Sequence, residues 1–206
     1  MSKNWLVISL ISLAGFFVLS VLVKKQLVSQ FDFNSTVRVQ NHIPQKIDPL
    51  LSALSLVGSF EIMSFVLLLW LIISRARLPG LAVLALYALG MVIELAGKIY
   101  LSHSGPPFMF FRYDLDFIFP SSYVQTGNSF PSGHAYRAVF LAVLFIYRFR
   151  RKFIVSLPIS LLVIAMLVSR VSLGEHWASD VLGGTLLGLS LASLSLSYLT
   201  SRPHRL

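Results

Sequence analysis

The sequence predicts an all-α fold, a bundle of six transmembrane helices, and three observations carry that prediction. Hydrophobic residues make up 56% of the 206 residues and charged residues only 12%, whereas a soluble domain has about a quarter charged residues. The mean hydropathy is +0.78. The apolar residues also gather in runs near the ~20 residues that cross a bilayer core of about 30 Å. We therefore expect one integral membrane domain over residues 1–206.

The expected spans are the apolar runs 5–23, 51–73, 81–97, 134–149, 153–169 and 180–200. The first run is too long for a signal peptide and no small-residue cleavage site follows it, so we interpret it as a retained anchor. Polar residues fill 26–50, which we interpret as an exposed connection to the second span. Arginines, Pro79 and Gly80 separate the second span from the third.

Loop-forming and small residues justify the later elements. Residues 98–131 hold Pro, Gly, Asp and Ser, and we expect a long loop there. The fourth span ends in a cluster of basic residues, Arg148, Arg150, Arg151 and Lys152. The sixth span has small residues at four-residue spacing, Gly184, Gly188 and Ala192. Such a stripe lets a neighbouring helix approach closely.

The sidedness follows from the basic loop between the fourth and fifth spans. Six spans place both termini on one side, and the basic residues divide almost evenly between the two sides. Because this loop concentrates its charges beside a span end, we place it and the termini in the cytoplasm. The segments 98–134 and 169–180 then face the extracytoplasmic side.

Composition excludes other classes of protein. The chain has no cysteine, which excludes Cys-ligated zinc, iron–sulfur clusters and thiol nucleophiles. The net charge of +9 raises the question of nucleic-acid binding. However, the basic residues flank apolar runs and lack the interleaved aromatic residues of a single-strand binder. We expect the lipid bilayer, and no nucleic acid, as a partner; the oligomeric state stays open.

Polar residues at the outer span ends require a functional explanation. Lys98 closes the third span, and residues 131–134 open the fourth. Arg170 closes the fifth span, and His176 and Asp180 open the sixth. Because all these span ends face the same side in the expected topology, we expect the residues to converge at one interfacial site.

One part of this set suits an anion. Ser132 and Gly133 lie where a helix begins, and the free backbone N–H groups there favour a negative charge. Lys98 and Arg170 add positive charge, and a guanidinium can bind phosphate oxygens in bidentate fashion. We expect Glu94, four residues before Lys98, to pair with it.

The other part suits phosphoryl chemistry. His176 and Asp180 are four residues apart, on one helix face. The carboxylate can hold one imidazole nitrogen protonated and leave the other as a nucleophile. His134 is a second imidazole, suited to protonating a leaving oxygen. We take Glu175 as a solvated turn residue. The set predicts a phosphate site with a nucleophile, an orienting carboxylate and an acid.

These residues resemble the type 2 phosphatidic acid phosphatase family, whose site is shared with vanadium haloperoxidases and acid phosphatases. The family's Pro-Ser-Gly-His motif is complete at residues 131–134, and its Ser-Arg…His…Asp motif is complete at 169–180. The resemblance implies that His176 forms a phosphohistidine, that Asp180 orients it, and that His134 protonates the leaving group and then helps to activate water. It implies four phosphate-binding residues, Lys98, Ser132, Gly133 and Arg170. It implies neither a metal nor another cofactor.

The remaining family motif departs from the pattern. Lys98 is present, but Gly105 occupies the position of a phosphate-binding arginine. Three alternatives stay open: another cation substitutes, the substrate depends less on this contact, as a diphosphate would, or activity is reduced. The candidate substitutes are Arg137, Arg112 and His103.

We therefore expect a membrane lipid phosphatase, because catalytic groups at helix ends meet lipid head groups. Polyprenyl diphosphate such as undecaprenyl diphosphate, phosphatidylglycerol phosphate and phosphatidic acid all fit, and the resemblance to short bacterial members favours the first. One alternative is a lipid phosphotransferase. Another is a lipid-binding or transport protein, which needs ionisable groups deep within spans; the candidates for that are Glu61, Glu94 and Arg137.

Overall fold

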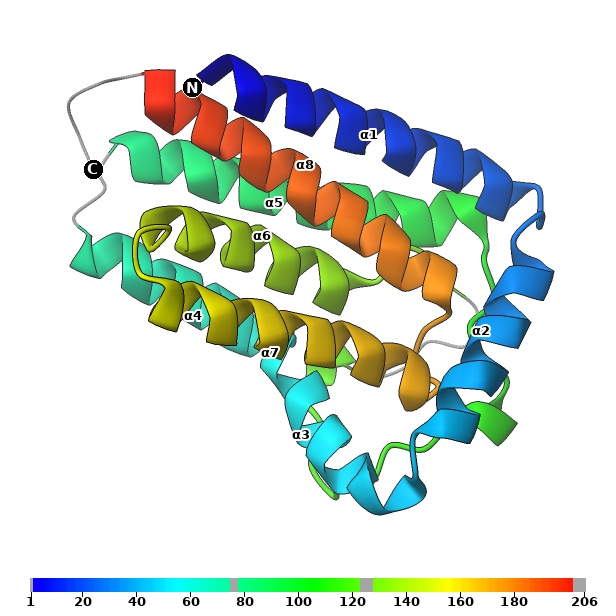
Figure 1. Cartoon of the computed structure of the whole chain (residues 1–206). Coiled ribbons are helices and arrows are strands. Elements are labelled where there is room, and N and C mark those ends of the chain that lie inside the picture. The colour runs from blue at the N-terminus through cyan, green and yellow to red at the C-terminus, as the bar shows by residue number, and fades with distance from the viewer. Residues whose placement is uncertain (1, 75–77, 123–127, 202–206) are drawn as a thin grey trace.

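A computed structural model of the protein describes residues 2–74, 78–122 and 128–201. Over these residues the chain is all-helical, as predicted (Figure 1). The helices are α1 (Ser2–Lys24), α2 (Ser29–His42), η1 (Gln45–Ile47), α3 (Asp48–Val57), α4 (Phe60–Ile73), α5 (Leu78–Leu101), η2 (Phe108–Phe110), η3 (Pro120–Ser122), α6 (Gly133–Arg148), α7 (Phe153–Ser172) and α8 (Ala178–Ser201).

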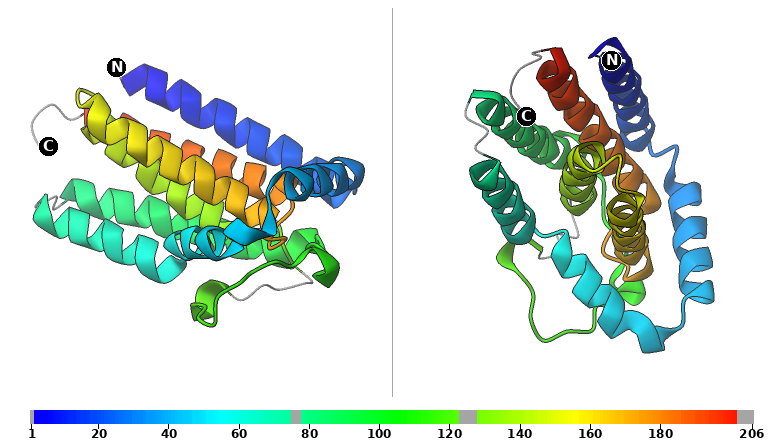
Figure 2. Two further views of the ribbon diagram at one scale, coloured as in Figure 1. Left: turned by 60° about the horizontal axis from the view of Figure 1, so that its bottom comes forward. Right: turned by 60° about the vertical axis from the view of Figure 1, so that its left-hand side comes forward.

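The long helices α1, α4, α5, α6, α7 and α8 lie side by side in one bundle, while α2 and α3 lie at one end of it (Figures 1 and 2). The centre of the bundle is α6, which contacts α4, α5, α7 and α8. Most of its side chains are buried. The centre therefore holds the segment that carries the predicted Pro-Ser-Gly-His motif.

The predicted stripe of small residues forms the contact between α8 and α6. A Cβ added at Gly184 would meet the backbone of Ser132 and Tyr136, and one at Gly188 would collide with the Tyr136 carbonyl. Ala192 is fully buried in the main core. Because no larger side chain stands between them, the two helices that carry the motifs lie against each other.

Four described helices, α1, α5, α7 and α8, are long and apolar enough to cross a membrane, and a fifth span results if α3 and α4 count as one. At 1.5 Å per residue the 16 residues of α6 extend about 24 Å, less than a bilayer core of about 30 Å. The count of six spans therefore stays a prediction. The expected second span is broken at Gly58 and Ser59 into α3 and α4, which are bent by 49°.

The segment 26–50 differs from the expected exposed connection, because it contains the helix α2. Asp32 and Thr36 are buried on one face of α2. The Asp32 carboxylate accepts hydrogen bonds from the backbone N–H and the hydroxyl of Ser179, at 2.8 and 2.7 Å. The polar composition of this segment gave no sign of a helix, because α2 packs through Asp32 against the polar start of α8 and not against an apolar face.

The start of α1, the end of α8 and the basic turn after α6 lie at the same end of the bundle (Figure 1). This arrangement agrees with the expected grouping of termini and basic loop. Arg75, Arg77, Arg202 and Arg205 lie outside the described residues. The assignment of this end to the cytoplasm stays a prediction.

Candidate active site

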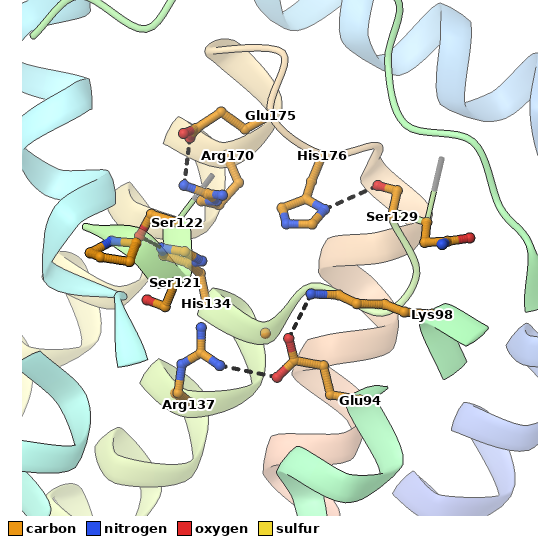
Figure 3. A pocket seen from close by; sticks show the side chains of 13 residues that line it. Glu94, Lys98, Ser121, Ser122, Ser129, His134, Arg137, Arg170, Glu175 and His176 are labelled. Atoms are coloured by element: carbon orange, nitrogen blue, oxygen red, sulfur yellow. Dashed lines mark hydrogen bonds and ion pairs between the residues drawn. The ribbon is translucent and has the colours of Figure 1, made fainter. Parts of the chain in front are cut away.

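The predicted polar groups meet at the opposite end of the bundle, around a cavity of about 140 Å³ (Figure 3). Helices α5, α6 and α7, the turn before α8 and the short helix η3 each contribute to its wall. Its lining residues are Glu94, Lys98, Pro120, Ser121, Ser122, Asn128, Ser129, Gly133, His134, Arg137, Arg170, Glu175 and His176. Of the residues expected to converge, Lys98, Gly133, His134, Arg170 and His176 line this cavity.

His176 is held through its Nδ1 atom. This nitrogen lies 3.4 Å from Asp180 Oδ2 and 3.1 Å from the Ser129 hydroxyl. Asp180 Oδ2 also accepts from the Ser129 hydroxyl and, at 2.9 Å, from the Trp177 backbone N–H. With Nδ1 engaged in this way, Nε2 is the ring nitrogen suited to attack a phosphorus atom in the cavity.

A tight turn after α7 brings His176 to this position. Its backbone N–H donates to the Arg170 carbonyl at 3.1 Å. Gly174 in the turn has a φ of +66°, and a Cβ there would collide with the Phe110 carbonyl. Glycine meets both demands at once, since it adopts positive φ readily and has no Cβ.

The surroundings favour the neutral form of His176. Burial lowers its pKa from the usual 6.5, and the positive charges of Arg170 and Lys98 lower it further, while Asp180 opposes the shift. A neutral imidazole is the form that can act as a nucleophile. The lowered pKa therefore favours an unprotonated His176 ring at neutral pH.

His134 lies in the first turn of α6, opposite His176 across the cavity (Figure 3). Its Nε2 is 3.0 Å from the Ser122 hydroxyl. The Ser132 side chain caps α6 by accepting from the Ala135 N–H at 3.5 Å. Gly58, at the bend between α3 and α4, packs against the ring, and a Cβ there would come within 3.0 Å of it. The absence of a side chain at Gly58 therefore leaves room for this imidazole.

Two cations share one carboxylate at the cavity wall. Lys98 Nζ donates to Glu94 Oε1 at 2.9 Å, as predicted, and an Arg137 nitrogen donates to Glu94 Oε2 at 3.0 Å. A Cβ on Gly133 would collide with the same carboxylate. The absence of a side chain at Gly133 thus lets Glu94 reach both cations beside the positive end of α6.

Arg170 lies on the other side of the cavity and is fully buried. It donates to Glu175 Oε2 at 2.5 Å and to the Ser55 hydroxyl. The expectation that Glu175 is a solvated turn residue is wrong, because its side chain is buried in this ion pair. Burial raises the pKa of Glu175, against the opposing effects of Arg170 and Ser55.

Of the three candidate substitutes for the missing motif arginine, Arg137 lines the cavity and the other two do not. Arg112 binds the Asp48 carboxylate through two nitrogens, at 2.9 and 2.8 Å. His103 lies behind Asp180, with Nε2 3.6 Å from Asp180 Oδ1. Ser132 also stays outside the cavity, where its backbone N–H donates to the Asp180 carbonyl.

The sequence did not indicate three residues that contact the predicted site residues: Ser55 and Glu175, which bind Arg170, and Ser129, which binds His176. Ser55 comes from α3, and Ser129 lies two residues before the motif at 131–134. No residue pattern marked the two serines as partners of buried ionisable groups. Within the described parts of the chain, no three His, Asp or Glu side chains are grouped so that they could hold a metal ion.

The family comparison agrees with this geometry. The sequence model of the PAP2 superfamily matches residues 79–203, a segment that includes α5 to α8. No curated protein sequence matches the chain.

Two solved structures share the fold. The first transmembrane PAP2 type phosphatidylglycerolphosphate phosphatase from Bacillus subtilis aligns with a TM-score of 0.77 and 19% identity, covering 96% of this chain and 98% of that one. LpxE from Aquifex aeolicus aligns with a TM-score of 0.65 and 21% identity, covering 82% and 96%. Together with the apolar helices, this likeness identifies a multi-pass membrane protein.

Proposed function

We propose that this chain, which belongs to the PAP2 superfamily, hydrolyses a phosphomonoester or diphosphate of a membrane lipid through a phosphohistidine intermediate. One observation carries the proposal. A carboxylate-bound imidazole, a second imidazole and three cations surround a single small cavity: His176, His134, Lys98, Arg137 and Arg170. Such a set can bind a phosphoryl group, attack it and protonate what leaves.

In the first step, His176 Nε2 attacks phosphorus and forms an N–P bond. The bond from phosphorus to the lipid oxygen, or to the bridging oxygen of a diphosphate, breaks at the same time. His134 gives its proton to that leaving oxygen, and Asp180 stabilises the positive charge on the His176 ring. Lys98, Arg137 and Arg170 hold the phosphoryl oxygens as charge develops on them.

In the second step, a water molecule attacks the phosphohistidine. His134, now deprotonated, takes the water proton as a general base. The N–P bond breaks, inorganic phosphate leaves, and His176 returns to the neutral form. The protein's own cations neutralise the phosphate in both steps, so the proposed reaction needs no metal.

The position of the cavity supports a lipid substrate. It lies where α5 and α7 end and where α6 and α8 begin, with room for a phosphoryl group and a few waters. A lipid can present its head group there while its chains stay in the bilayer. Among lipid phosphates, we propose polyprenyl diphosphate as the first substrate to test, with phosphatidylglycerol phosphate and phosphatidic acid as the others. We place this end of the bundle on the extracytoplasmic side.

The test is phosphate release by the purified full chain in detergent, from these three lipids in parallel and in the presence of EDTA. Release that survives EDTA supports the metal-free mechanism, and the preferred lipid identifies the head group. Transfer of the phosphoryl group to an added lipid or sugar acceptor, without release of inorganic phosphate, would indicate a phosphotransferase. A protein that binds the lipids without any turnover would contradict the proposal.

We expect Arg137→Ala to lower kcat/KM by about 10- to 100-fold, because hydrogen bonds to charged groups contribute about 1.5–3 kcal/mol. If Arg137 replaces the missing motif arginine, the loss approaches that of Arg170→Ala, and Arg137→Lys restores part of it. The measurement is steady-state phosphate release. Arg148→Ala is the matched control, since this arginine is exposed at the far end of α6. An Arg137→Ala protein with unchanged kinetics would remove the residue from the proposed site.

We expect the acid limb of kcat/KM to lie below pH 6.5. His176 must lose its proton before it attacks, and burial lowers its pKa from 6.5. Activity therefore rises with pH through that lowered value, and the protonated His134 that the first step needs sets a separate alkaline limb. The measurement is a pH profile of kcat/KM. Glu175→Gln is the control, because it distinguishes the titration of the His176 ring from that of the neighbouring Glu175 carboxyl. An acid limb above pH 6.5, or one that disappears in Glu175→Gln, would contradict the assignment to His176.

A further inference from the structure

A second ionisable cluster lies directly behind the carboxylate that holds His176. His103, in the loop after α5, has its Nε2 atom 3.6 Å from Asp180 Oδ1 and 3.7 Å from Asp32 Oδ2. Asp32 comes from α2 and Asp180 from α8. The imidazole therefore lies between two carboxylates that belong to different helices.

The two carboxylates need a cation between them. The Asp180 and Asp32 side chains are only 0% and 2% exposed, and two buried negative charges this close to one imidazole repel each other. Asp180 Oδ2 is occupied by Ser129 and the Trp177 N–H. Asp180 Oδ1 has only His103 as a partner of opposite charge among the described residues. A protonated His103 between them reduces this repulsion.

We propose that His103 is a positioning residue. As an imidazolium held by Asp32, it contacts Asp180 Oδ1 and keeps this carboxylate in the orientation that presents His176 for attack. This inference rests on the proposed role of His176 and adds to it, because it couples α2 to the nucleophile through a residue that does not touch the phosphate cavity.

The electrostatics agree with this geometry. Burial alone would lower the pKa of His103, but Asp32 and Asp180 outweigh that effect and raise the pKa above its usual value. The raised pKa favours the charged form of His103. On the proposal, a positive His103 also disfavours a positive charge on the neighbouring His176, since like charges repel each other.

His103 also has a route to solvent that avoids the phosphate cavity. It lines a second cavity of about 320 Å³ with Asp32, Lys24 and Trp177. The charged groups that face His103 are Asp32 of α2 and Asp180 of α8, and Lys24 of α1 lies across this cavity. The space leaves room for a longer cationic side chain in place of His103.

The test combines histidine-ring NMR and phosphate release on the full-length protein in detergent. In His103→Gln the pKa of His176 is expected to rise by about one unit, since a neighbouring positive charge is lost. We expect kcat to fall about tenfold, as for other residues that support a functional side chain from behind, with KM within twofold. His103→Arg is expected to restore both values. His42→Gln, an exposed histidine on α2, is the control and is expected to change neither.

An unchanged His176 pKa in His103→Gln would overturn the proposal. A loss of kcat without that pKa change, and without rescue by arginine, would indicate a structural role only and would also overturn it. If His103→Gln fails to fold, Asp32→Asn decides: we expect it to lower the pKa of His103, and an unchanged value contradicts the pairing. The NMR measurements do not depend on turnover. A protein without phosphatase activity would therefore contradict the proposed function, while the pKa of His176 would still test the role of His103.

Discussion

The His176→Ala protein is expected to release no phosphate above background, a loss of at least about 10⁴-fold. Removal of a nucleophile leaves only the binding contributions of the site. The fold should persist, because Asp180 keeps its contacts with Ser129 and the Trp177 N–H. The measurements are phosphate release and covalent labelling by lipid that carries a radioactive phosphate. Wild-type protein is expected to trap an acid-labile phosphohistidine, and the variant none.

The matched control for this experiment is His42→Ala, since His42 is an exposed histidine on α2. It is expected to keep wild-type release and labelling. Turnover that survives in His176→Ala, or a label that remains on the variant, would contradict the assignment of His176 as the nucleophile. The cavity contains a second imidazole, His134, and labelling of that residue would exchange the two roles.

Asp180→Asn is expected to lower kcat by about 10³- to 10⁴-fold, by analogy with the loss of an orienting carboxylate in other enzymes. The amide has nearly the same shape but no charge, so it cannot stabilise the positive ring that forms when His176 attacks. One of its ends is also a donor, whereas Asp180 Oδ2 accepts from Ser129 and Trp177. The measurement is kcat, with thermal unfolding in detergent as a check on the fold.

Two comparisons make this second prediction specific. Asp116→Asn changes an exposed carboxylate and is expected to leave kcat unchanged. The double variant His176→Ala/Asp180→Asn is expected to be no worse than His176→Ala alone, because Asp180 acts through His176 and such effects are not additive. Additive losses would mean that Asp180 contributes by another route, and a small effect of Asp180→Asn would contradict its orienting role.

The sequence alone determined the helical class and the membrane location, together with the chemistry that the site residues offer. These features depend on short-range information. Runs of apolar residues define membrane helices by length, and the four-residue spacing of His176 and Asp180 places them on one helix face. Several of the polar residues lie at predicted helix ends: Lys98, residues 131–134 and Arg170. Because successive spans run in opposite directions, the sequence placed these ends on the same side. The resemblance at 131–134 and 169–180 also led to the family that the comparison identifies.

The sequence left unresolved which of the three candidate cations lies at the cavity. The three candidates looked equivalent as charges, and their different positions depend on partners far along the chain. Arg112 forms an ion pair with Asp48, and His103 lies between Asp32 and Asp180. Arg137 reaches the cavity because Glu94, more than 40 residues earlier, holds it there.

Only the tertiary structure decided the surroundings of the chemical groups. Three features were not predictable: the bend at Gly58, the burial of Glu175 against Arg170 and Ser55, and the hydrogen bonds of Asp32 to the start of α8. They depend on contacts between segments that are distant in sequence, or on a segment whose polar composition gave no sign of its structure. In a membrane chain, lipid-facing and buried helix faces are both apolar, so periodicity carries little information about which faces meet. Polar contacts between helices depend on geometry that appears only when the bundle is assembled, and they set the charge and orientation of the site.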